Sequence, residues 1–96
     1  MTDEKLLEVI ARYESEMPRY MEWAKQWRDD FDIEALTHLA EMLPQMREFV
    51  RDGRREKLMR WLGWVQGVLF MCNIYTLEEM KQHNMPDRPK EERWTQ

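Results

Sequence analysis

Apolar residues recur at helical spacing along most of this chain. The first stripe predicts a helix over residues 3–16, and it is formed by Leu6, Leu7, Ile10, Tyr13 and Met17. Thr2 is a suitable N-cap for this helix. Pro18 then either begins a second helix or kinks a continuous one. The stripe continues beyond it at Tyr20, Trp23, Ala24 and Trp27.

A second stripe follows a polar break at residues 29–32. Asp32 is the predicted N-cap, because Phe31 and Leu36 around it have the spacing of a hydrophobic staple. The stripe predicts a helix as far as Arg51, and Pro44 must kink that helix or split it in two. It consists of Leu36, Leu39, Ala40, Leu43, Met46, Phe49 and Val50. Gly53 is a good residue to follow the helix end.

The segment from residue 54 to 72 predicts a helix that is apolar all round. In a chain of 96 residues, enclosing such a helix on every side requires another subunit. Gly63 and Gly67, four residues apart, would let a second backbone approach closely. An equally open alternative is that these glycines fit bulky neighbours. The predicted oligomer interface is made by Trp61, Gly63, Trp64, Gly67, Val68 and Met71.

The last predicted helix begins with a capping box. Thr76 and Glu79 form it, with Tyr75 and Met80 at staple positions. This short helix ends near residues 83–84, and residues 85–96 read as a mobile tail. The fold prediction is therefore an all-α domain over residues 1–84, a small helical bundle of about four helices that forms an oligomer.

Composition supports an interaction protein of the cytoplasm. The chain has nine Met and five Trp, two residue types that are enriched at protein interfaces. Cys72 is the only cysteine, which excludes a disulfide framework and gives a cytoplasmic location as the default. Residues 61–74 form the longest apolar stretch, which is too short to span a bilayer, and residues 1–5 lack the features of a secretory signal.

Charge is distributed unevenly along the chain. Residues 1–32 carry five basic and nine acidic side chains, whereas residues 54–96 carry eight basic and six acidic ones. A general nucleic-acid binder usually has a strong basic excess. The asymmetry instead favours self-association or a charged protein partner.

The pattern of reactive side chains argues against an enzyme. His38 and His83 do not have metal-ligand spacing, so no metal site is predicted. Ser15 lies between two glutamates, and Cys72 ends an apolar helix, where burial would make it a structural thiol. There is no glycine-rich phosphate loop. We expect no catalytic residues and no cofactor. Gln66, among apolar neighbours, either bridges two helices, which is the more common role, or contacts a ligand.

A cluster of cationic side chains is a candidate binding site for an anion. It comprises Arg47, Arg51, Arg54, Arg55, Lys57 and Arg60. Free N–H groups and guanidinium groups at a helix start suit an anion, and Trp61 and Trp64 could stack on a base. The predicted anion-binding set is therefore Arg51, Arg54, Arg55, Lys57, Arg60, Trp61 and Trp64. The favoured alternative is that carboxylates of the first helix or of another subunit neutralise these cations.

Residues 60–69 read Arg-Trp-Leu-Gly-Trp-Val-Gln-Gly-Val-Leu, followed by Ile74-Tyr75-Thr76 and by His83-Asn84. This pattern resembles a group of small uncharacterised proteins of tailed bacteriophages and prophages, whose usual form has Phe in place of Trp64. Their form also has a glycine where this chain has Cys72-Asn73. The match includes none of residues 1–50. The resemblance implies a viral origin and action in the bacterial cytoplasm.

Two functions follow as hypotheses. The first is a homo-oligomeric accessory protein that binds, and inhibits, a host protein of antiviral defence. The alternative is that the cation cluster sequesters a phosphate-bearing nucleotide at a subunit interface.

Overall fold

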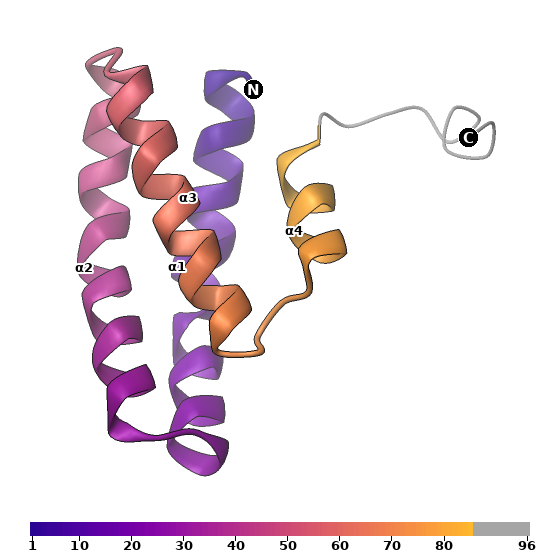
Figure 1. Ribbon diagram of the computed structural model, residues 1–96. Helices are drawn as coiled ribbons and strands as arrows, with labels where there is room; N and C mark the ends of the chain where they lie inside the picture. Colours follow the sequence, from indigo (N-terminus) through magenta and orange to yellow (C-terminus); the bar gives the residue numbers. More distant parts are fainter. Residues whose placement is uncertain (86–96) are drawn as a thin grey trace, which may run out of the picture.

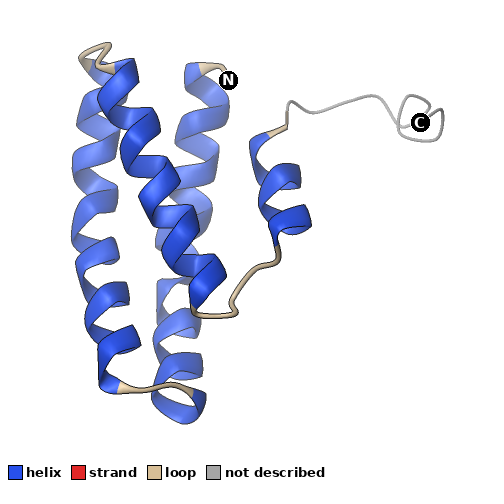
Figure 2. Ribbon diagram, in the orientation of Figure 1, coloured by secondary structure: helices blue, strands red, loops and turns tan. Residues whose placement is uncertain are grey.

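Four α-helices make up the structure, a computed structural model that describes residues 1–85 (Figures 1 and 2). They are α1 (Asp3–Trp27), α2 (Asp30–Arg51), α3 (Arg55–Met71) and α4 (Leu77–Asn84). The first two form an antiparallel hairpin, α3 returns beside α2, and α4 lies apart from α2 on the other side of α3 (Figure 1). The all-α prediction is confirmed. The predicted tail, apart from Met85, lies outside the described residues.

Two helix starts test the predicted caps. Thr2 caps α1, because its hydroxyl accepts the backbone N–H of Lys5 at 3.1 Å. The predicted N-cap of α2 is wrong by almost one helical turn. Asp29, not Asp32, is its N-cap and accepts the N–H of Asp32 at 3.0 Å. The Asp32 carboxylate is instead taken by Arg28, whose Nε donates to it at 2.6 Å.

The hydrophobic staple predicted at the start of α2 is also wrong. Because the helix begins at Asp30, Phe31 lies inside its first turn rather than before the cap. Its side chain is 78% exposed, whereas Leu36 is fully buried. Phe31 is therefore an apolar surface residue and does not form a staple with Leu36.

Neither proline divides a helix. Helix α1 runs through Pro18, and α2 runs through Pro44. Each proline lacks an N–H and so removes one helical hydrogen bond. Both prolines are exposed, so the carbonyl left without that bond can be hydrated. The long hairpin is thus built from two uninterrupted helices.

Helices α2 and α3 end in the same way. After α2, Gly53 takes φ 71°, and the N–H of Arg54 donates to the carbonyl of Phe49 at 2.9 Å. After α3, Asn73 takes φ 59°, and the N–H of Ile74 donates to the carbonyl of Leu69 at 2.9 Å. Both are Schellman motifs. Asn73 can replace the expected glycine because asparagine tolerates the left-handed region better than most residues.

The core fills the space between α1, α2 and α3. Its fully buried aliphatic side chains include Leu6, Val9, Ile10, Leu36, Leu39, Leu43, Leu58, Val65 and Leu69. Helix α3 buries one face there, and its opposite face is exposed in the single chain. No helix of residues 1–85 combines the length and the apolar character needed to cross a membrane.

Candidate functional site

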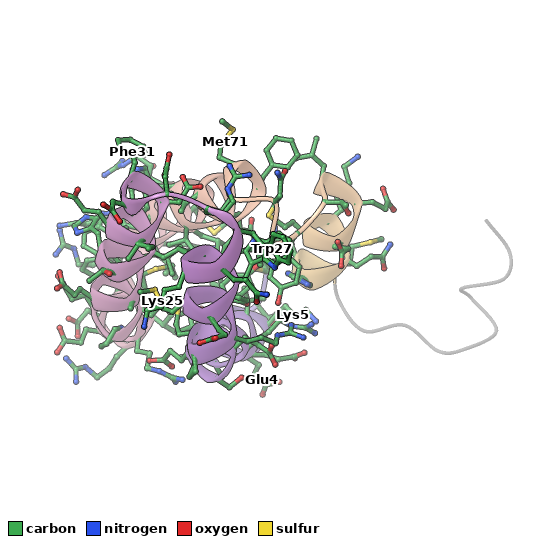
Figure 3. All side chains as sticks on the ribbon, turned by 90° about the horizontal axis from the view of Figure 1, so that it is seen from below. Glu4, Lys5, Lys25, Trp27, Phe31 and Met71 are labelled. Atoms are coloured by element: carbon green, nitrogen blue, oxygen red, sulfur yellow. The ribbon has the colours of Figure 1, made fainter. Side chains whose placement is uncertain are left out.

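The exposed side of α3 is apolar over its C-terminal half. We call this surface the outer face of α3, and it consists of Gly63, Trp64, Gly67, Phe70 and Met71. Met71 is 69% exposed, Trp64 43% and Phe70 40%. Phe31 of α2 projects from the same side of the molecule as Met71 (Figure 3). Large apolar side chains therefore gather on a surface that no other part of residues 1–85 buries.

A groove runs along each edge of this face. The groove toward α2 has a volume of about 490 Å³, and Phe31, Asp32, Trp64, Gly67 and Met71 are among its lining residues. The groove toward α4 has a volume of about 340 Å³. It is lined by Gly63, Gln66, Gly67, Phe70, Leu77, Met80, Lys81 and Asn84. Gly67 borders both grooves and so lies on the ridge between them.

Five of the six predicted interface residues come together here. Gly63, Trp64, Gly67 and Met71 lie on the outer face, and Val68 lines the groove toward α2. Trp61 points away toward α2, where its ring and that of Phe49 pack edge-to-face with centroids 4.7 Å apart. A Cβ added at Gly63 or Gly67 would meet nothing within 4 Å. Within this chain, the glycines are therefore not required by bulky neighbours.

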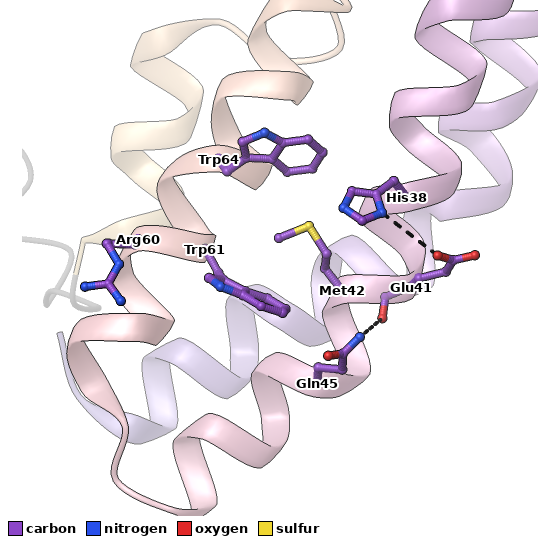
Figure 4. A pocket seen from close by; sticks show the side chains of 7 residues that line it. All are labelled: His38, Glu41, Met42, Gln45, Arg60, Trp61 and Trp64. Carbon is purple, nitrogen blue, oxygen red and sulfur yellow. Dashed lines mark hydrogen bonds and ion pairs between the residues drawn. The ribbon is translucent and has the colours of Figure 1, made fainter.

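A separate cleft of about 500 Å³ opens between α2 and α3. Trp61 and Trp64 reach into it from α3, and Met42 lies between them (Figure 4). His38 faces Trp64 edge-on, with ring centroids 5.4 Å apart. Arg60 lines this cleft together with Glu41 and Gln45. Of the predicted anion-binding residues, Arg60, Trp61 and Trp64 are the three that this cleft brings together.

The other cations of the cluster lie around the turn between α2 and α3. Arg54 and Lys57 stand over the ring of Phe49, at 5.3 Å and 5.0 Å from its centroid. Arg51 pairs with the neighbouring Asp52 at 3.3 Å. These contacts hold the cations on the protein's own aromatic and acidic side chains.

Carboxylates of α1 neutralise two cations of this cluster. Arg55 donates to Asp3 at 3.3 Å, and Arg47 Nε donates to Glu14 at 2.8 Å. The favoured prediction, that acids of the first helix pair with the cluster, is confirmed for these two. Binding of an anion by the remaining cations stays a prediction.

The interior between α1, α3 and α4 holds a polar network that joins Tyr13, Gln66, His83 and Asn84. We call it the α4 network. Gln66 Nε2 donates to the Tyr13 hydroxyl at 3.0 Å and to Asn84 Oδ1 at 2.7 Å. Asn84 Nδ2 donates back to Gln66 Oε1 at 3.0 Å. Gln66 therefore bridges helices, and the prediction of that role is confirmed.

Tyr13 and His83 complete this network at 2.8 Å between the hydroxyl and Nδ1. Burial raises the pKa of Tyr13 to about 12, so the phenol keeps its proton. Burial lowers the pKa of His83, and the charge of Arg12 lowers it further. A neutral imidazole offers Nδ1 as an acceptor, so Tyr13 donates to His83 while accepting from Gln66.

Two further contacts hold the segment between α3 and α4. The hydroxyls of Tyr20 and Tyr75 lie 2.8 Å apart, and Trp23 Nε1 donates to the carbonyl of Cys72 at 3.1 Å. Burial raises the pKa of the Cys72 thiol to about 11, consistent with the predicted structural thiol. The contacts made by Trp23 and by the two tyrosines therefore stabilise the segment between α3 and α4.

Sequence reasoning missed the pairing of Tyr13 with His83. Their positions are 70 residues apart, and helical periodicity only assigns a residue to a face of its own helix. One signal was present, because a polar Gln66 among apolar residues requires buried partners. Within residues 1–85, no three His, Cys, Asp or Glu side chains are grouped to hold a metal ion.

No family model, curated protein or solved structure matches this chain. The resemblance of residues 60–69 to phage proteins therefore stays a prediction.

Proposed function

We propose that this chain is a non-enzymatic accessory protein that acts by binding another protein, and that it does so as a homo-oligomer. The outer face of α3 is the observation that carries this proposal. With Phe31, its exposed apolar surface is on the order of 400 Å². The largest apolar patch on a small protein is often functional, and here it is formed by large side chains that gather on one side of the molecule.

The proposed target is a host protein of antiviral defence, met in the bacterial cytoplasm. The phage-like motif at residues 60–69 supports the viral origin. Exposed acids on α1, including Glu4 and Glu22, suit a partner with a basic surface. Acting on such a target would require binding alone, which fits a chain in which no catalytic group was predicted.

An infection assay tests this function. Bacteria carrying one defence system at a time would express the chain and be challenged with a phage that the system restricts. We expect plaque formation to return in one such strain. The variant Met71→Glu should fail to restore it, whereas Gln26→Glu, which adds the same charge on an exposed site of α1, should restore it. Failure of the wild-type chain in every strain contradicts the proposed target.

The cleft between α2 and α3 favours a second candidate, a site for a phosphate-bearing nucleotide. Trp61 and Trp64 could stack on a base, and Arg60 could contact a phosphate. Thermal melting with nucleoside monophosphates and triphosphates tests it. A nucleotide that binds would raise the melting temperature, and Arg60→Glu would remove the shift. If no nucleotide shifts the wild-type protein, this candidate is eliminated.

A further inference from the structure

We propose that a second copy of this chain packs antiparallel against the outer face of α3, with the twofold axis passing beside Gly67. This arrangement rests on the self-association proposed above and gives it a geometry. Each copy would present the same face, as a twofold interface requires.

The first argument is the symmetry of the face itself. Its five positions are 63, 64, 67, 70 and 71, which are evenly placed about 67. In an antiparallel pair centred on Gly67, position 63 of one copy meets position 71 or 70 of the other. Position 64 likewise meets 70 or 71. Every apolar side chain of the face would therefore meet the same face of the second copy.

The second argument is shape. A twofold axis that lies in the interface keeps the α2 side of one copy opposite the α2 side of the other. Trp64 and Met71 both line the groove toward α2, so they would meet each other. Gly63 and Phe70 both line the groove toward α4, so the Phe70 ring would lie over the open surface at Gly63. Gly67, where no side chain stands, would allow the two helices to approach closely.

The third argument is charge. Arg60 lies on the exposed side of α3, one turn before the apolar half, and Asp30 lies in the first turn of α2, beside the C-terminal end of α3. Both side chains are exposed, and neither has an ion pair within residues 1–85. Antiparallel packing brings Arg60 of each copy to Asp30 of the other. Parallel packing would instead bring the two Arg60 side chains together, which is unfavourable.

The size of the surface is adequate for such a dimer. A standard interface buries about 800 Å² on each partner. The exposed apolar side chains supply on the order of 400 Å² as its centre. The walls of the two flanking grooves, which are partly polar, would supply the rim that surrounds an apolar interface centre.

Light scattering during size-exclusion chromatography tests the second copy. The wild-type protein is expected at twice its chain mass of 12.0 kDa. Met71→Glu should give a single chain, because a charge would be buried within the apolar interface. Its helical circular dichroism and melting transition should persist, since Met71 is 69% exposed. Gln26→Glu should remain a dimer. A wild-type monomer at high concentration would overturn the proposal and leave the face to a different protein.

A charge exchange tests the antiparallel geometry separately. Arg60→Asp and Asp30→Arg should each weaken dimerisation by about tenfold, as expected when one partner of a coupled pair is reversed. The double variant should recover most of the wild-type affinity. Mixing the two singly changed chains should restore dimerisation, because each of the two pairs in the mixed dimer then joins an aspartate to an arginine. If none of these charge changes alters the dimerisation affinity, the antiparallel arrangement is wrong. Self-association, and so the proposed function, would remain intact.

Discussion

The α4 network and the outer face of α3 lie on neighbouring parts of one small molecule and differ in how completely they are satisfied. In the network, Tyr13, Gln66, His83 and Asn84 are all hydrogen-bonded within the chain. On the outer face, Trp64, Phe70 and Met71 have large exposed surfaces. Buried polar groups must be hydrogen-bonded within the chain, whereas exposed apolar groups can be covered when another molecule binds. The contrast indicates which surface is built for a partner.

The largest effect should separate the two faces of α3. Leu69→Ala removes a side chain with no exposed surface and should lower the free energy of unfolding by about 2–5 kcal/mol. Met71→Ala, two residues away, should lower it by less than about 0.5 kcal/mol. Urea unfolding at high dilution, where self-association contributes little, measures both. Equal losses would contradict the division between a buried and a free face.

The next effect tests the α4 network. Tyr13→Phe removes the hydroxyl that Gln66 and His83 share, leaving buried polar atoms without a partner. We expect the free energy of unfolding to fall by about 1–3 kcal/mol. Ser15→Ala, which removes an exposed hydroxyl bonded to the Arg12 carbonyl, is the matched control and should change little. Hydrogen exchange should show the loss first in the amides of α4. A neutral result would mean that α4 is held by its apolar contacts alone.

A pH titration sharpens the role of His83. Its pKa is lowered in the folded chain, so the unfolded chain takes up a proton first as pH falls. Stability should therefore be full above the unfolded pKa of about 6.5 and decline below it, by at most about 1.4 kcal/mol per pH unit. His83→Gln should flatten this slope near pH 6. The backbone N–H of Thr76 holds the pKa of Glu79 below its usual range. Protonation of Glu79, which weakens this hydrogen bond, should therefore lower stability only at a more acidic pH than the titration of His83.

The smallest effect concerns the turn that joins the two regions. Asn73 has φ 59°, a conformation that costs most residues about 1–2 kcal/mol. Asn73→Ala should lower stability by about 1 kcal/mol, and Asn73→Gly should preserve it. Thermal unfolding of the two variants measures the difference. Gly53→Ala, at the matching turn after α2, should behave like Asn73→Ala. If Asn73→Ala is neutral, the turn contributes no conformational preference.

Local sequence signals predicted much of this fold. The capping box at Thr76, the cap at Thr2 and the helix end at Gly53 follow from side-chain chemistry within a few residues, and each is confirmed. The start of α2 was missed because several neighbouring aspartates can all cap a helix. In the structure Asp29 caps the helix, and the carboxylate of Asp32 accepts from Arg28. Helical periodicity carries no information about which aspartate takes which role.

The candidate site was predicted only in outline. Apolar periodicity placed Trp64, Gly67 and Met71 on one helix, but it could not show which side of that helix the core would cover. That depends on how α2 and α4 pack against α3. The cleft around His38 was also not predicted, because its walls come from two helices whose register is set by tertiary packing.

The short connections between the first three helices have a kinetic consequence. Arg28 and Asp29 alone join α1 to α2, and residues 52–54 join α2 to α3. Neighbouring helices can therefore dock through contacts that are close in sequence, a topology that is associated with rapid folding. Tyr13 must find His83 across 70 positions, so docking of α4 is expected to be the last step. A refolding experiment should therefore show the bundle of α1, α2 and α3 forming before α4 packs against it.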